Sequence, residues 1–232
     1  MFNFGISKES AVKTVRPQLK PWNIYDVKFA GCEVREFAGK KDPSVTYKVL
    51  DIKFENEDGY FTVTKFFPKE GDEIRREVDG KNGGKRELAS NFEELMNIVK
   101  QTAEVLTPEG FKKMQEASAK FKSFDDVAKA LITITDKVKG TATKIKLVGR
   151  NRDNRVVAEI PNITSVFDGV ATITDNYIGN KLFFSDYEEG KRAEYLKSKP
   201  TDMKEAKADP IMSVEAPAAT ADDSEFNLDD LL

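Results

Sequence analysis

The chain has 232 residues, of which 39% are hydrophobic and 33% charged, proportions that favour a soluble globular protein. The single cysteine, Cys32, excludes an intrachain disulfide, and the absence of histidine excludes a Cys/His zinc site and a histidine general base. No apolar run approaches the roughly 20 residues of a membrane-spanning helix, and no secretory signal pattern is present, so we expect no membrane partner and a cytoplasmic location.

The net charge of −3 is distributed unevenly along the chain. From Pro200 to the C-terminus, nine acidic residues stand against two lysines, a balance of −7, which leaves +4 for the rest of the chain. A mildly basic body with an acidic tail is typical of proteins that bind nucleic acid.

The chain begins with an arm and a first strand. Residues 1–21 form a basic N-terminal arm that lacks hydrophobic periodicity. Residues 22–37 predict an extended strand, and Gly31 in its middle suits a β-bulge or a tight bend.

Residues 46–68 predict a β-hairpin. Leu50, Ile52 and Phe54 alternate with more polar residues up to a turn at 56–59, and residues 60–67 return with a second alternation. One face can serve a core, while the other offers aromatic rings beside lysines. On a regular strand Lys65 and Phe66 point to opposite faces.

A Gly-rich segment and a helical insert follow. Residues 68–90 predict a solvated loop. Residues 90–138 predict three helices, although Ile132–Ile134 also fit a strand. Each helix begins at a capping pattern: Ser90 with Glu93, Thr107 before Pro108, and Ser123 with Asp126.

Two further strands complete the core, which we expect to span residues 22–190. Residues 141–149 alternate clearly, residues 150–154 form an arginine-rich turn, and residues 155–160 form the paired strand. Lys181–Phe184 suggests one more short strand. Residues 191–221 read as a charged helix and linker, and residues 222–232 as a disordered acidic tail.

The order of these elements predicts a mainly β (α+β) fold. Three strands, a helical insert and two strands match a five-stranded OB-fold-like barrel with helices between strands 3 and 4, a fold that binds oligonucleotides. Rings can stack on bases, and lysines and arginines can follow phosphates. The residues that we expect to bind DNA are Lys20, Trp22, Tyr25, Lys28, Tyr47, Lys53, Tyr60, Lys65, Phe66, Lys144, Lys146, Arg150, Arg152 and Arg155.

The C-terminal tail predicts a partner-binding segment. Acidic residues alternate there with large apolar ones, a combination that suits a partner groove with a basic rim. The tail can also lie on the basic groove of its own body and compete with DNA. Its binding residues are Asp222, Asp223, Glu225, Phe226, Leu228, Asp229, Asp230, Leu231 and Leu232.

This layout resembles the phage-encoded replication single-stranded DNA-binding proteins. The opening Phe2–Ile6, followed by Val15-Arg16-Pro17 and Lys20-Pro21-Trp22, also looks phage-like. The resemblance implies an OB-fold core and a flexible acidic tail that recruits polymerase, primase or helicase. Bacterial relatives end in a run of Asp and then Ile-Pro-Phe, whereas this chain ends in Leu231-Leu232. The resemblance therefore does not identify the partner of its tail.

The sequence is compatible with three functions. The leading hypothesis is a non-catalytic protein that coats single-stranded DNA during replication, recombination or repair, without a cofactor. The second is a virion-associated or other structural protein that docks through the helical insert. The third is a metal-dependent nuclease using carboxylates such as Asp51, Glu55, Glu57 and Asp58, although no Gly-rich phosphate loop or nucleophile motif is present.

Overall fold

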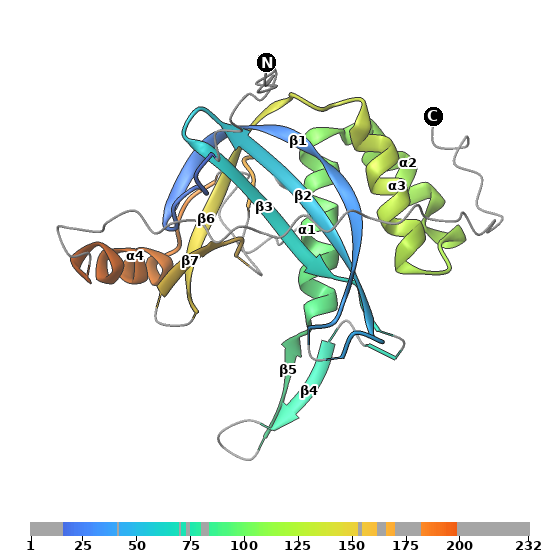
Figure 1. Ribbon diagram of the computed structural model, residues 1–232, viewed down its shortest axis with the longest axis horizontal. Coiled ribbons are helices and arrows are strands. Elements are labelled where there is room, and N and C mark those ends of the chain that lie inside the picture. Colours follow the sequence, from blue (N-terminus) through green and yellow to red (C-terminus); the bar gives the residue numbers. More distant parts are fainter. Residues whose placement is uncertain are drawn as a thin grey trace, which may run out of the picture.

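A five-stranded antiparallel sheet organises the chain in the computed structural model (Figure 1). The structure describes residues 16–40, 42–69, 71–72, 75–79, 84–152, 155–161, 166–169 and 182–198. Its elements are β1 (Asn23–Ala38), β2 (Thr46–Asn56), β3 (Gly59–Phe66), β4 (Arg75–Asp79), β5 (Lys85–Ala89), α1 (Asn91–Leu106), α2 (Pro108–Ala117), the 3-10 turn η1 (Ser118–Lys120), α3 (Phe124–Asp136), β6 (Ala142–Arg152), β7 (Arg155–Glu159) and α4 (Asp186–Ser198).

The strands follow the order β3-β2-β1-β6-β7, so β1 is central and β3 and β7 are the edges of an open sheet. The first part of β1 pairs with β6, from Asn23 to Lys28, and the second part pairs with β2, from Lys28 to Ala38. The predicted α+β class, with a helical insert between the third and fourth strands of this sheet, is confirmed.

Gly31 forms the predicted bulge in β1. The pairing register with β2 shifts between Phe29 and Gly31, and Gly31 has φ +130°. An L side chain rarely adopts that backbone conformation, so glycine is the residue that fits the bulge.

The β2–β3 hairpin has the predicted alternation. Its turn is held by the Asn56 side-chain oxygen, which accepts hydrogen bonds from the N–H groups of Asp58 and Gly59 at 3.0 Å each. On the core face, Ile52 lies opposite Val63 and Phe54 lies opposite Phe61, and these four side chains are buried.

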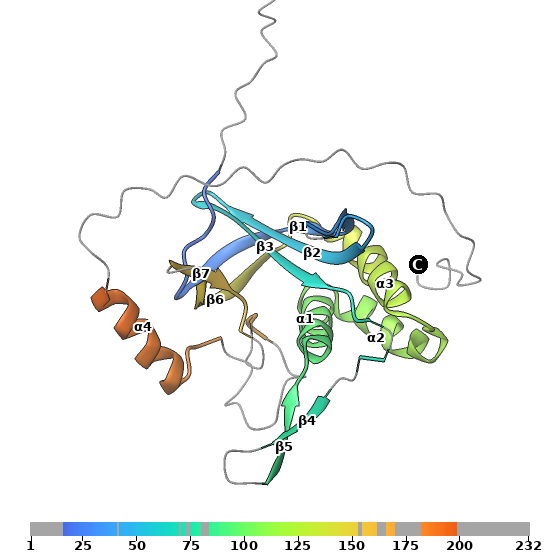
Figure 2. The same cartoon turned by 60° about the horizontal axis from the view of Figure 1, so that its bottom comes forward.

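Helices α1, α2 and α3 lie on one side of the sheet (Figures 1 and 2). Leu95 and Val99 of α1 and Leu131 of α3 are fully buried and belong to the same hydrophobic core as the inward residues of β2 and β3. The predicted caps are present at two of the helices: Ser90 accepts from the N–H of Glu93, and Ser123 forms a reciprocal capping box with Asp126. Because tertiary packing decides the ambiguous end of α3, Ile132–Ile134 is helical.

The segment predicted as a loop contains a second hairpin. Strands β4 and β5 pair with each other and extend away from the helices and the main sheet (Figures 1 and 2). Each of these strands has a single large aliphatic residue, Val78 in β4 and Leu88 in β5, so both lack the hydrophobic alternation that signals a strand. The prediction of a loop was therefore wrong for β4 and β5.

The two ends of the predicted core also differ from expectation. Residues 16–20 of the arm run beside β3: the Pro17 carbonyl accepts from the N–H of Tyr60 at 3.0 Å, and the N–H of Leu19 donates to the Tyr60 carbonyl at 2.9 Å. Leu182–Phe184, expected as a strand, is not one, and α4 begins two residues later. The acidic tail and residues 1–15 lie outside the described residues.

None of the helices in the described ranges is long and apolar enough to cross a membrane.

Candidate nucleic-acid interface

The cross-strand register places most of the predicted binding residues on one side of the sheet. We call the side opposite the buried core positions the outer face. Side chains directly opposed across two strands share a face, and every second residue of a strand returns to it. By this register the outer face carries Lys28, Tyr47, Lys53, Tyr60, Phe66, Lys144, Lys146, Arg150, Arg152 and Arg155.

Three rings form an aromatic cluster on the outer face of β1, β2 and β3. Phe37, Tyr47 and Phe66 lie with ring centroids 5.8 to 6.0 Å apart. Phe66 is 55% exposed, so the cluster is open to solvent. The Arg35 guanidinium lies 5.5 Å from the centroid of the Phe37 ring, which adds a cation above an aromatic plane.

Asp51 fixes the arginine beside this cluster. The residue is only 3% exposed although it lies on the outer face. Its carboxylate accepts hydrogen bonds from Arg35 Nε at 2.9 Å and from Thr64 Oγ1 at 2.5 Å. A buried carboxylate needs such partners, and the pairing orients the guanidinium over the ring of Phe37.

Phe37 and Arg35 were not predicted as binding residues. Before the bulge, residues such as Lys28 lie on the outer face of β1, whereas after Gly31 the odd-numbered residues lie there. A strict alternation through the whole strand would give Phe37 the same face as the buried Phe29. The signal that could have identified both residues is the predicted glycine bulge, because a bulge reverses the alternation.

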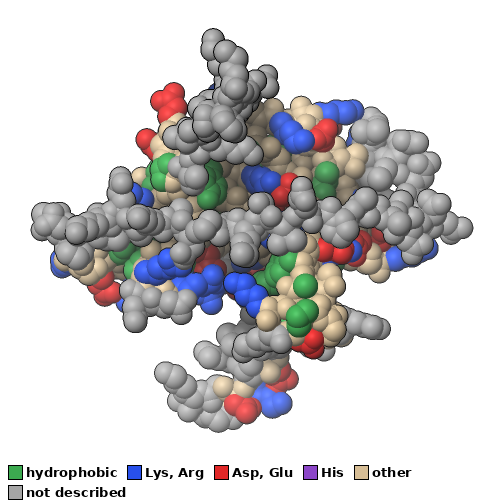
Figure 3. All heavy atoms as spheres, in the orientation of Figure 1, with side chains coloured by type: hydrophobic (Ala, Val, Ile, Leu, Met, Phe, Trp, Pro, Cys, Tyr) green, Lys and Arg blue, Asp and Glu red, His purple; other side chains and the backbone are tan. Residues whose placement is uncertain are grey.

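Basic side chains follow β6 along the same face. We call Lys144, Lys146, Arg150 and Arg152 the cation row, and Figure 3 shows Lys and Arg side chains gathered over the β6–β7 hairpin. Strand β6 continues to Arg152 and β7 begins at Arg155, so the three arginines predicted in a turn lie in strands, and residues 153–154 lie outside the described residues.

The exposed members of the cation row are available to an anion. Lys144 Nζ lies 3.8 Å from a carboxylate oxygen of Asp26, and Arg150 donates to Glu159 at 2.9 Å. Exposed ion pairs of this kind contribute about 0 to 1 kcal/mol, so phosphate can replace the carboxylates at little cost. Arg152 lies directly opposite Arg155, and two like charges in that position favour an anion between them.

Lys146 is not on an exposed surface, contrary to the prediction. The residue is 1% exposed, because α4 covers it. The ammonium donates to the Glu188 carboxylate at 3.1 Å and to the Phe183 carbonyl at 3.0 Å. Burial lowers the pKa of Lys146, and the carboxylate of Glu188 opposes that shift.

Three other predicted residues lie away from the outer face. Lys65 lies on the core side of β3, as the alternation required, and its ammonium pairs with Glu94 at 3.1 Å. Tyr25 lies on the core side of β1, and its hydroxyl accepts from the N–H and donates to the carbonyl of the exposed Lys20. Trp22 is half-buried at the start of β1, and a Cβ at Gly149 would meet its indole.

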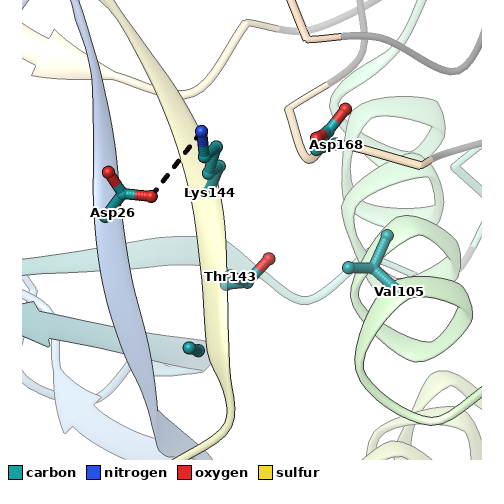
Figure 4. A pocket seen from close by; sticks show the side chains of 6 residues that line it. Asp26, Val105, Thr143, Lys144 and Asp168 are labelled. Carbon is teal, nitrogen blue, oxygen red and sulfur yellow. Dashed lines mark ion pairs between the residues drawn. The ribbon is translucent and has the colours of Figure 1, made fainter.

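A cavity of about 380 Å³ opens between β1, β6 and α1 (Figure 4). It is lined by Asp26, Val105, Ala142, Thr143, Lys144 and Asp168. No aromatic ring lines it, and the Lys144–Asp26 pair lies at its edge. Across the described ranges, no group of three or more Asp, Glu, Cys or His side chains could hold a metal ion.

No protein-family model, no curated protein and no solved structure matches this chain.

Proposed function

We propose that this protein binds single-stranded DNA with little sequence preference, in phage DNA replication, recombination or repair. The observation that carries the proposal is the solvent-open aromatic cluster of Phe37, Tyr47 and Phe66 beside Arg35. Base–aromatic stacking contributes roughly 1 to 3 kcal/mol per base and tolerates any sequence. Contacts to ring faces and phosphates do not read base edges.

The strand order supports an OB-fold-like barrel as the scaffold. A long, bulged first strand pairs with both the second and the fourth strands of the sheet, and the helices are inserted between the third and fourth. A five-stranded, partly open barrel of this kind binds oligonucleotides on the outer face of its middle strands. The aromatic cluster lies on that face of β2 and β3.

The remaining parts of the proposal come from the sequence. The protein acts without catalysis and without a cofactor, in the cytoplasm of the host cell. The acidic–hydrophobic residues from Asp222 to Leu232 recruit replication proteins such as a polymerase, primase or helicase.

Fluorescence anisotropy of a labelled oligo-dT tests the proposal. We expect binding at about 50 mM salt that weakens steadily as the salt concentration rises, because binding releases counterions from the DNA and this gain shrinks in concentrated salt. Replacing Phe66 with Ala removes one stacking ring and should weaken binding about 5- to 150-fold. Val34→Ala is the control, because Val34 is a partly exposed apolar residue of β1 that lies on the opposite face of the sheet.

Two results would contradict the proposal. Absence of oligo-dT binding by the wild-type protein at low salt would overturn the function, and an exposed aromatic surface would then indicate a protein interface. Equal affinities of Phe66→Ala and Val34→Ala would remove the aromatic cluster from the site.

A further inference from the structure

Helix α4 is held on the outer face by polar groups rather than by a hydrophobic face. Of its residues, only Glu188 is buried. Arg192, one turn later, donates from Nε to the Trp22 carbonyl at 3.2 Å. Of the large apolar side chains of the helix, Tyr187 and Leu196 are exposed and Tyr195 is half-buried. By contrast, α1 and α3 bury apolar side chains in the core.

This mode of attachment is weak for a helix of this length. Attraction within a buried ion pair roughly offsets the cost of removing both charges from water. The Lys146–Glu188 pair therefore fixes the position of α4 on the sheet but adds little to the free energy that holds it there. Helices below about 12 to 15 residues are marginal in water by themselves, and α4 has 13 residues. Release of α4 from the sheet is therefore coupled to loss of its helical structure.

The covered lysine occupies a position within the cation row. Lys144, Lys146 and Arg150 project from the same face of β6, with roughly 7 Å between alternate residues of a strand. Lys144 and Arg150 are exposed, whereas Lys146 between them is capped by α4. The helix thus interrupts the row of cations that a phosphate backbone would follow.

The groups under α4 are suited to a nucleotide. The Glu188 carboxylate receives hydrogen bonds from Lys146 in the manner of a phosphate oxygen. The Lys146 ammonium lies 5.7 Å from the Phe184 ring centroid, and that centroid is 6.4 Å from the ring of Trp22. Arg192 of α4 lies 5.2 Å from the same Phe184 centroid, so removing α4 exposes a cation beside an aromatic ring.

We propose that α4 is a displaceable cover over a further nucleotide site, and that single-stranded DNA bound along β6 replaces the Glu188 carboxylate with a phosphate at Lys146. This inference rests on the proposed function. Displacement exchanges one anion for another at the same ammonium, so no buried charge is left unpaired. Helix α4 unfolds on release, and its 13 residues join the segment that leads to the acidic tail.

Hydrogen exchange of the full-length protein, with and without saturating oligo-dT, tests the displacement. Anisotropy on the same samples confirms that the oligonucleotide is bound. We expect the amides of α4 to exchange at least about 10-fold faster in the complex, because unprotected amides report local unfolding. Bound oligonucleotide with unchanged or slower exchange in α4 would overturn this inference alone, and absence of binding would overturn the proposed function with it.

Two substitutions in α4 should change DNA affinity in opposite directions. Glu188→Gln removes the charge that competes with phosphate, so we expect at least about 3-fold tighter binding. Gly190→Ala places a methyl group where nothing lies within 4 Å and favours the helix, so we expect binding up to about 5-fold weaker.

Glu194→Gln is the matched control for Glu188→Gln. It removes the same charge from the same helix, but Glu194 pairs with Lys191 at the exposed surface. We expect wild-type affinity for this variant. Equal affinities of the Glu188→Gln and Glu194→Gln variants, or no change with Gly190→Ala, would overturn the displaceable cover, with circular dichroism confirming that each variant is folded.

Discussion

Single residues decide which side chains of the sheet reach solvent. Gly31 reverses the alternation of β1, so that Arg35 and Phe37 reach the outer face and Cys32 faces the helices. Asp51 then holds Arg35 in place from a buried position on the same face. The chemistry of the outer face thus depends on the backbone conformation of one glycine.

Cys32 should be nearly inert in the folded protein. Burial raises the pKa of its thiol to about 12, against an ordinary value of 9.0, and the side chain of Thr135 only partly opposes this. At pH 8 the thiolate fraction is then about one in ten thousand, and the thiolate is the reactive form. We expect negligible reaction with Ellman's reagent at about pH 8 in the native state and complete reaction once urea has unfolded the protein.

The same shift in pKa makes the stability of the folded protein depend on pH. Folding favours the protonated thiol, so the contribution of Cys32 is fully present below pH 9 and decreases as the pH rises from 9 toward 12. Rapid labelling of the native protein at about pH 8 would contradict the burial of Cys32 against α3.

At the scale of elements, the N-terminus of α3 depends on a local capping box. Ser123 and Asp126 satisfy each other's backbone N–H groups, and Asp126 is buried. Ser123→Ala should lower the free energy of unfolding by about 1 kcal/mol. Urea denaturation measures this change, with Ser118→Ala as control, because Ser118 is exposed and only bonds back to the Gln115 carbonyl. Equal midpoints for the two variants would show that the box contributes nothing.

Elements governed by nearby residues could be predicted from the sequence. The capping box at Ser123, the bulge at Gly31 and the β2–β3 hairpin each depend on residues within a few positions of one another, and the structure has all three. Strands β4 and β5 could not be predicted, because they lack hydrophobic alternation.

The candidate site was predictable only in part, for a similar reason. Tyr47 and Phe66 were both predicted to bind, and the structure brings their rings together on one face. Alternation placed Lys146 beside Lys144 on a solvent face, but its partner Glu188 lies 42 positions away. Sequence periodicity assigns a residue to a face and cannot tell which distant segment covers it.

At the scale of the whole molecule, charge is divided between the body and the C-terminal segment. The segment that starts at Pro200 carries a balance of −7 and the rest of the chain +4. If the body binds DNA as proposed, we expect the tethered acidic segment to compete for the same cations, and salt to screen both interactions.

Truncation after Ala221 should therefore strengthen DNA binding. It removes five acidic residues, and we expect tighter oligo-dT binding at about 50 mM salt, with the difference shrinking as the salt concentration rises. Anisotropy titrations measure both quantities. A full-length variant with serine at Phe226, Leu228, Leu231 and Leu232 keeps the charge and should bind as the wild type does. Identical affinities of the truncated and full-length proteins would leave recruitment as the sole role of the tail.

The double pairing of β1 also constrains how the chain folds. Ala38 pairs with Thr46, eight positions away, whereas Asn23 pairs with Leu147, 124 positions away. Closing so long a loop costs entropy before any contact repays it, and folding slows as the mean sequence separation of contacts grows. The second half of β1 can therefore assemble with β2 and β3 early, while its first half must wait for β6 to arrive from beyond the helices. The two pairings of β1 meet at Lys28, just before the bulge at Gly31 where the register with β2 changes.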